Sequence, residues 1–464
     1  MSARMRTLTP LAAALLLAGC SMIPTYQRPP APVADSFPYP SATDGTPAAQ
    51  LPWENFFTDA RLRSLIASAL ANNRDLRVAV LNIAQARAQY DIRNADRLPN
   101  VGLNASATRA PNAFGKEASI YTANLAVSSW ELDFFGRVAS LSESALDQYF
   151  ATEEGRKAAQ ITLISTVANT WLALAADEEL LRITRETLAT REETLRLSKL
   201  RFENGVTSEI DFRLAQSLTE SSRAALAQTE RQRANDIDAL ALLVGQPLPP
   251  DYTTGVDTLG VTLPDVPAGV PSDVLVRRPD VRQAEQQLLA ANANIGAARA
   301  AFFPRISLTA GAGTASTQLS GLFKGGSFVY SAGASLVQPI FDAGRNSANL
   351  ASAEVARDIA VAQYERSIQQ AFRDVADALA GRATYGEQVR AVGAVVEAES
   401  ARYRLARLRY DAGVASYLDL LDAQRSLFAA QTTLVQSRLQ RLQNQVLLYR
   451  SLGGGWTEPP VAAR

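Results

Sequence analysis

The stretch that decides the fold is RYDAGVASYLDLLDAQR, residues 409–425, because the chain contains it twice. Its earlier copy is RFENGVTSEIDFRLAQS, residues 201–217, and the two align without a gap at an offset of 208 positions, as from Gly205 to Gly413. The same offset joins Gly245 to Gly453. A period of about 200 residues is far longer than that of solenoid repeats. We therefore interpret the chain as a duplication of one large unit.

In each copy, two helical patterns meet at a Gly-Val pair. Glycine tolerates the positive φ of a helix C-cap, and the hydroxyls of Thr207, Ser208 and Ser416 are placed to accept hydrogen bonds from the first amides of the next helix. Each copy is therefore predicted to be the tip of a helical hairpin. One such tip is an ordinary connector, whereas two matching tips on long arms are suited to meeting a partner.

The arms of these hairpins are very long. Residues 138–203 and 345–411 contain no proline, and a helix of more than 60 residues is about 100 Å long. The partner arms, at residues 208–244 and 416–452, are shorter. We expect the missing length from helical segments earlier in each repeat, at residues 59–97 and 279–302.

The N-terminus has the pattern of an export signal, with Arg4 and Arg6 before the apolar run from Leu8 to Leu17. Leu-Ala-Gly-Cys20 resembles the bacterial lipobox, in which the signal is cut before a cysteine that then carries acyl chains. Cys20 is the only cysteine, so it can form no internal disulfide. We expect a signal peptide at 1–19 and a lipidated Cys20, with a plain signal peptide as the alternative. By resemblance to bacterial lipoproteins, the following serine implies sorting to the outer membrane.

Residues 20–58 are expected to form this lipid anchor and an extended strap. Seven prolines between positions 24 and 47 oppose helix formation there. The segment up to Pro52 is predicted to be extended and coreless.

Composition excludes several classes of function. Lys plus Arg and Asp plus Glu each number 46, so the chain has no net field that would attract nucleic acid. It contains no histidine and its lone cysteine is expected to be acylated, which removes the usual nitrogen and sulfur metal ligands. The motifs of nucleotide-binding proteins and serine hydrolases are missing as well. We expect no catalytic residues, no metal and no cofactor, and hence no enzyme.

Four stretches of about ten residues alternate apolar and small polar side chains, in two hairpins at about 99–131 and 304–338. After residue 20 no run reaches the roughly 18 apolar residues of a membrane helix, so a membrane crossing would use these strands. Two soluble hairpins are the alternative. Because four strands cannot close a barrel and lipid does not tolerate open edges, several copies would have to contribute, and three would give twelve strands and a conducting lumen.

Several motifs in order make the chain resemble the TolC-like outer-membrane factor family, in particular the lipoprotein branch that includes OprM and serves RND-type efflux pumps. These motifs are the lipobox, WENFFTD (53–59), NRDL (73–76), RRPDV (277–281), FP (303–304), the tip at 410–425 and LGGGW (452–456). The resemblance implies an α+β membrane protein: a homotrimer with a twelve-stranded outer-membrane barrel, continuous with a long helical coiled-coil tunnel in the periplasm. The expected repeats are 59–245 and 273–453, joined by a linker at 246–272 and followed by a tail at 454–464.

The resemblance also assigns roles near the tips. Leu418, Asp422 and Arg425 match the positions that narrow the periplasmic mouth, and their spacing puts them on one helix face. Asp422 and Arg425 could pair within or between copies. A periplasmic adaptor protein is expected to contact the tips at Arg201, Gly205, Val206, Arg409, Gly413 and Val414.

The favoured function is a passive outer-membrane exit duct for drugs or other small toxic compounds, supplied by an inner-membrane RND transporter through the adaptor. The alternative is the exit duct of a type I protein secretion system, because a wide lumen does not itself select its cargo. A remote third possibility is a structural lipoprotein spacer.

Overall fold

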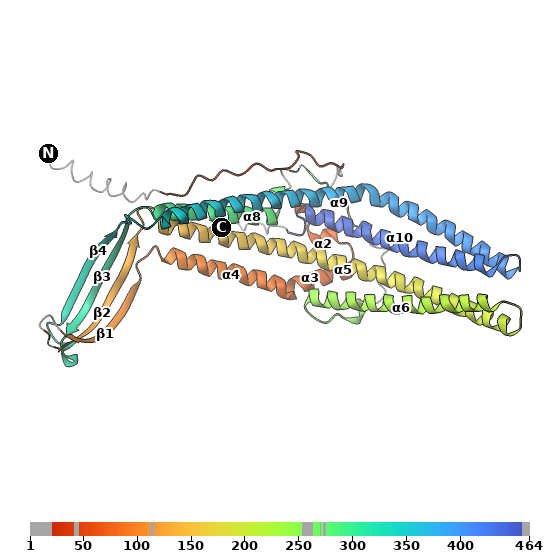
Figure 1. The fold of residues 1–464 in the computed structure, drawn as a ribbon, viewed down its shortest axis with the longest axis horizontal. Coiled ribbons are helices and arrows are strands. Elements are labelled where there is room, and N and C mark those ends of the chain that lie inside the picture. Colours follow the sequence, from red (N-terminus) through yellow and green to blue (C-terminus); the bar gives the residue numbers. More distant parts are fainter. Residues whose placement is uncertain are drawn as a thin grey trace. The chain divides into compact units, whose positions relative to one another are not determined.

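The computed structural model describes residues 21–40, 46–111, 115, 117–252, 263–269, 271 and 275–456. The predicted signal peptide and Cys20 lie outside the described residues. The helices and strands are, in order (Figure 1): α2 (Trp53–Phe56), α3 (Ala60–Asn72), α4 (Arg74–Ala95), β1 (Val101–Pro111), β2 (Glu117–Leu132), α5 (Arg137–Glu203), α6 (Glu209–Val244), α8 (Pro279–Ala300), β3 (Arg305–Ser316), β4 (Phe328–Val337), α9 (Arg345–Asp411) and α10 (Tyr417–Ser451). Short 3-10 turns lie at Ala48–Gln50, Pro250–Tyr252 and Leu319–Gly321.

The two long arms are confirmed as unbroken helices, since α5 and α9 each contain 67 residues. Figure 1 shows α6 returning alongside α5 and α10 returning alongside α9. One stretch of α5 is long and apolar enough to span a membrane, but 56% of it is buried inside the protein, as in a core helix. This stretch is interrupted by polar residues, so the expectation that no uninterrupted run reaches about 18 apolar residues still holds.

The segment predicted as helical at 59–97 forms two helices that break at Asn73. The Asn73 side chain accepts a hydrogen bond from the amide of Leu76 (2.9 Å) and donates one to the carbonyl of Leu243 in α6 (2.9 Å). It thus caps the start of α4. Nearby, a Cβ added to Gly245 would meet the carbonyl oxygen of Asn72 at 2.6 Å, so only glycine fits where α6 ends.

The four predicted strands form one antiparallel sheet in the order β1-β2-β3-β4. The register runs from Val101 opposite Val127 in the first pair to Arg305 opposite Val337 in the last. The register of β2 against β3 shifts between Val127 and Trp130, where Ser129 has a φ of 57°. A bulge of this kind increases the local twist of a strand. Within the described chain, β1 and β4 are edge strands that pair on one side only.

The chain divides into two compact units, and each draws on both repeats. One contains the sheet and α8, with Leu81–Glu154, Arg282–Ser367 and the chain up to Pro30. The other contains both hairpin tips, with Ala31–Val80, Gly155–Val281 and the chain from Ile368 onward.

The core of the tip-containing unit is built around aromatic side chains. Phe56 stacks on Tyr449 with ring centroids 3.9 Å apart, and the Tyr449 hydroxyl donates to the carbonyl of Leu51 at 2.6 Å. Trp171 and Phe57 are also fully buried in this cluster. Burial of each large apolar side chain contributes about 1.5–3 kcal/mol. The core therefore fixes the base from which the two helical hairpins of this unit extend.

The strap is extended over residues 21–40, as predicted, but its side chains also pack against the helices. In the sheet-containing unit, Arg28 forms a bidentate pair with Glu285 of α8 (2.6 and 2.9 Å), and Asn292 donates to the carbonyl of Pro24 (2.8 Å). In the other unit, Phe37 stacks on Phe372 at 5.2 Å. The strap is therefore packed on helices because its few polar and aromatic side chains find partners there.

Candidate functional site

Both hairpin tips end their first helix with the same glycine motif. Gly205 and Gly413 have φ values of 71° and 76°. The amide of Val206 donates to the carbonyl of Arg201 (2.8 Å), and that of Val414 donates to the carbonyl of Arg409 (2.9 Å). This is the Schellman geometry, which satisfies carbonyls at a helix end. The predicted C-caps are therefore confirmed in both copies.

The start of the second helix is capped by serine in each tip. Ser208 accepts from the amide of Asp211 and Ser416 from that of Asp419, both at 3.2 Å. In the second copy the Asp419 carboxylate also accepts from the Ser416 amide, which completes a capping box. In the first copy the hydroxyls of Ser208 and Thr207 bond to the Asp211 carboxylate and lower its pKa. The tips are thus rigid turns with related chemistry.

Apolar side chains project from these rigid tips into solvent. Val206 and Val414 are 73% and 66% exposed, and a Cβ at either tip glycine would meet nothing within 4 Å. Ile210 and Leu418 are exposed in the same way one turn later. Exposed aliphatic residues on an ordered turn are suited to contact with another protein.

The three residues assigned to the gate lie on α10 near its start, and all three are exposed. Asp422 forms an ion pair with Arg402 of α9, which also contacts Glu399 at 3.1 Å. Within the described chain no ion pair joins Asp422 to Arg425. The sequence left open a pairing of Asp422 with Arg425 within one copy. Among the described residues this pair is not formed, because the Asp422 carboxylate pairs with Arg402 instead.

The charge of Arg425 acts on a second arginine that the sequence did not single out. Arg191 of α5 is only 8% exposed, and it donates to the Leu218 carbonyl (3.1 Å) and the Ser222 hydroxyl (2.6 Å). Burial and the positive charge of Arg425 lower the pKa of Arg191. No carboxylate pairs with Arg191 among the residues that the structure describes. Arg191 also contacts α10 directly, since its guanidinium lies 5.9 Å from the centre of the Phe428 ring, and the like charge of Arg425 opposes this contact.

A polar contact between Arg201 and Tyr410 joins the two tips. Arg201 donates to the Tyr410 hydroxyl at 2.5 Å, and its guanidinium lies 5.1 Å from the centre of the Tyr410 ring. The position that corresponds to Tyr410 in the first copy is Phe202, which stacks on Phe212 instead. Arg201 and Arg409, both predicted to contact an adaptor, therefore have different surroundings within the chain. The sequence contained a sign of this difference, because the first copy has Phe202 where the second copy has Tyr410.

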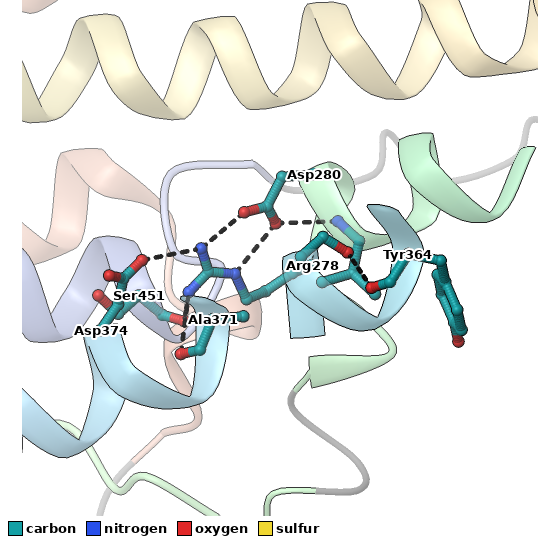
Figure 2. Close-up of polar contacts among 8 residues, drawn as sticks. Arg278, Asp280, Tyr364, Ala371, Asp374 and Ser451 are labelled. Carbon is teal, nitrogen blue, oxygen red and sulfur yellow. Dashed lines mark hydrogen bonds and ion pairs between the residues drawn. The ribbon is translucent and has the colours of Figure 1, made fainter. Parts of the chain in front are cut away.

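At the base of the second hairpin, Arg278 connects three helices (Figure 2). It bonds to Asp280 of α8 at 2.7 Å and to Asp374 of α9 at 3.3 Å, and it donates to the carbonyl of Ser451, the last residue of α10, at 3.0 Å. Although burial alone would raise the pKa of Asp280, the hydrogen bond from Arg278 lowers it. The RRPDV motif, predicted by resemblance only, thus has a structural role.

In the described part of the chain no group of three or more His, Cys, Asp or Glu side chains could hold a metal ion. The arrangement around the tips instead contains exposed apolar residues and arginine-carboxylate pairs. It is suited to contact with another protein.

A family profile described as "Outer membrane efflux protein" matches residues 65–246 and 270–454, one segment in each repeat. The toluene efflux pump outer membrane protein TtgI of Pseudomonas putida is 46% identical over 461 residues, which cover 97% of this chain and 98% of that protein. The antibiotic efflux pump outer membrane protein ArpC of Pseudomonas putida is 45% identical over 457 residues, with coverages of 96% and 94%.

Solved structures give the same result. The open state of the MtrE outer membrane channel of Neisseria gonorrhoeae superposes with a TM-score of 0.86 at 41% identity, and the match covers 94% of this chain and 98% of that one. The likeness therefore extends over the helices and the sheet together.

Proposed function

Because the chain belongs to the outer membrane efflux protein family and is an outer-membrane channel of an efflux pump, we propose that it conducts small toxic organic compounds passively out of the cell. The observation that carries this proposal is a single sheet of four strands with two open edges on a chain of very long helices. In a membrane the two open edges of such a sheet must be paired, and this requires several copies. The joined copies would enclose a lumen.

The proposed cargo is small and organic, since the relatives are named for toluene and antibiotic efflux. Deleting the gene in its host should raise susceptibility to apolar antibiotics and solvents, and the intact gene should restore resistance. Unchanged susceptibility together with loss of a secreted protein from the medium would favour type I protein secretion instead.

We propose three copies. Three four-stranded sheets make a barrel of twelve strands, wide enough to conduct, whereas two would make eight strands with a filled interior. The edge strands support this closure, because β1 begins and β4 ends at the same end of the sheet and would run antiparallel across copies. The membrane contact is with outer-membrane lipid, and acyl chains on Cys20 are proposed as an additional anchor.

We propose that Leu418, Asp422 and Arg425 narrow the periplasmic mouth. In a three-fold assembly each of them occurs three times around the axis. Apolar Leu418 would resist wetting, and Arg425 would meet carboxylates of neighbouring copies. The exposure of all three side chains in one chain supports this role, since such side chains are free to face the lumen or another copy.

We propose that a periplasmic adaptor contacts the tips, at Arg201, Gly205 and Val206 and at Arg409, Gly413 and Val414, and passes cargo from an inner-membrane RND transporter. The test is photo-crosslinking in cells from a reactive residue at Ala415, with Leu242, an exposed position at the far end of α6, as control. Capture of an RND adaptor or transporter from Ala415 alone is expected. An adaptor of an ATP-driven system would reassign the pump, and capture of neither would contradict docking at the tips.

A further inference from the structure

The most exposed large apolar side chains in the described chain are neighbours. Ile340 and Phe341 are 89% and 90% exposed, and they lie directly after β4, between the edge strand and α9. Two adjacent apolar side chains left this free in water are unfavourable, because burial of each would contribute about 1.5–3 kcal/mol. A partner surface is therefore expected for them.

The backbone around these two residues is held firmly. Before them, the Gln338 side chain donates to the carbonyl of Phe302 at 3.1 Å. After them, the Asp342 carboxylate accepts from the amides of Gly344 (3.0 Å) and Asn346 (2.9 Å), which caps α9. The Asn346 side chain donates to the carbonyl of Ala301 at 3.1 Å. The segment is thus an ordered projection and needs no further folding to bind.

The opposite edge of the same sheet carries a pocket of about 580 Å³. It lies at the start of β1, where Leu98 and Pro99 lead into the strand, and Leu98 is 70% exposed. Trp130 of β2 and the apolar Val138 and Leu141 of α5 form other parts of its wall. The wall also contains the charged side chains of Arg93, Asp96 and Glu131, so the pocket offers apolar surface together with polar groups beside an unpaired strand.

The two features meet when sheets of two copies join edge to edge. β1 begins and β4 ends at the same end of the sheet. Antiparallel pairing of β4 with β1 of a neighbouring copy brings the segment after β4 next to the segment before that β1.

The duplication supplies a template for this joint inside one chain. At the seam between β2 and β3, Phe135 after β2 stacks on Phe303 before β3, with centroids 4.7 Å apart. Pro99 and Pro304 precede the first strands of the two repeats, so Leu98 is the counterpart of Phe303. Phe303 thus has an aromatic partner from the end of the neighbouring strand, whereas Leu98 would find its partner only on another copy.

The internal seam between β2 and β3 differs in charge from the joint between copies. At the internal seam Glu131 forms an ion pair with Arg305 at 3.4 Å. The counterparts of these residues are Pro339 and Asn100, which carry no charge. Phe135 corresponds to Ala343, and the bulky side chains lie two and three residues earlier, at Phe341 and Ile340. A joint between copies would therefore depend on apolar contact.

We propose that Ile340 and Phe341 of one copy insert into the pocket at Leu98 of the next copy, forming an apolar joint at the periplasmic rim of the barrel. The partner is a second copy of this chain, and in this the joint rests on the proposed function. Each joint would extend the pairing of the edge strands beyond the membrane, and the ring would close when every pocket is filled.

The first experiment joins the two sites covalently. The full-length chain carrying Leu98→Cys and Phe341→Cys is expressed in outer membranes and treated with a short bis-maleimide. Covalent multimers up to the closed ring are expected. Each single variant is the control, which also reports any reaction of Cys20, and should give no closed ring.

The outcomes distinguish failure of the proposed joint from failure of the proposed barrel. If native mass measurement shows that the untreated protein is a multimer but the double variant forms no covalent multimer, the joint is wrong and the multi-copy barrel stands. If the untreated protein is a monomer, the proposed barrel is itself wrong.

A second experiment removes the Phe341 side chain from the proposed contact. Phe341→Ala should lower the temperature at which the multimer dissociates in detergent. The matched control is Phe323→Ala, since Phe323 is 81% exposed in the loop between β3 and β4, at the other end of the strands. Equal dissociation temperatures for the two variants would overturn the proposal. Because both side chains are exposed, neither change should unfold the single chain.

Discussion

Arg278 shows what single residues do in this protein that the sequence does not reveal. RRPDV was recognisable as a motif, but the partners of Arg278 lie far along the chain, with Asp374 96 positions away and Ser451 173 positions away. Local patterns report neighbours within a helix turn or a strand, so contacts of this kind are not predictable from them. The positive φ of Gly413, by contrast, follows from its own residue type and was predicted.

Replacing Arg278 with methionine should destabilise the tip-containing unit. The change leaves Asp280 and Asp374 without the guanidinium and the end of α10 without its donor (Figure 2). Because the carboxylates of Asp280 and Asp374 are 44% and 37% exposed and can be hydrated, the cost comes from the lost hydrogen bonds and is about 1–3 kcal/mol. Limited proteolysis of the purified channel measures the effect. The control is Arg277→Met, because Arg277 is the exposed neighbour, and equal sensitivity of both variants would contradict the role of Arg278.

Asp177 gives a prediction about pH. Burial and the neighbouring Asp236 raise the pKa of Asp177 to about 7. A carboxyl whose folded pKa is raised stabilises the fold at pH values below its unfolded pKa, near 4, and this stabilisation is lost as the pH rises through about 7. Asp177→Asn should therefore raise the unfolding temperature at pH 8 more than at pH 5.

The exposed Asp238 is the control for this experiment, since Asp238→Asn removes a carboxylate from the same pair of helices without removing a buried one. A gain in unfolding temperature that is the same at both pH values, or that Asp238→Asn reproduces, would show that the buried Asp177 carboxyl is not its cause.

At the scale of elements, the helical hairpins were predictable because their signals are local. Proline-free runs, a glycine at each turn and a serine after it define where each helix ends and the next begins. The break at Asn73 was missed although its cap on the Leu76 amide is local, and only its second hydrogen bond, to the carbonyl of Leu243 170 positions away, could not be read from the sequence. The pairing of Asp422 with Arg402 was missed because two helices must meet before those charges do.

The prediction about the gate concerns side chains of α10. Asp422→Ala combined with Arg425→Ala should raise the conductance of the isolated channel in a planar bilayer, because the charges that we propose to hold the mouth closed are removed. Arg402→Ala alone should not raise the conductance, since it frees Asp422 to pair with Arg425 of a neighbouring copy. Arg390→Ala is the control, as Arg390 forms a similar exposed pair with Glu387 elsewhere on α9. Unchanged conductance in the double variant would place the gate elsewhere.

At the scale of the whole molecule, the duplication accounts for what could be predicted and for what could not. Alternating strands and long arms repeat in both halves, so the sequence predicted a four-stranded contribution from each chain and two hairpins. The division into two compact units does not follow the repeats, because long helices carry each repeat through both units. The copies have also diverged where they are expected to contact other proteins, as Phe202 and Tyr410 illustrate.

The last prediction concerns how the whole chain is held in the membrane. The barrel and the proposed acyl chains are two separate attachments, and the strap that links them is itself fixed to α8 by Arg28 and Glu285. A chain with Cys20→Ala, exported by the signal peptide of an unlipidated outer-membrane protein, should incorporate no labelled palmitate but still assemble as a multimer in outer-membrane fractions.

The control for this variant is the same exported chain with Cys20 retained, and the readouts are labelled palmitate and the oligomer in detergent extracts. Loss of the multimer in the Cys20→Ala chain alone would mean that the acyl chains are needed for assembly and not only for attachment. If the multimer persists and Arg28→Ala then weakens it, the strap contributes through its contact with Glu285, whose carboxylate would be left partly buried with fewer donors.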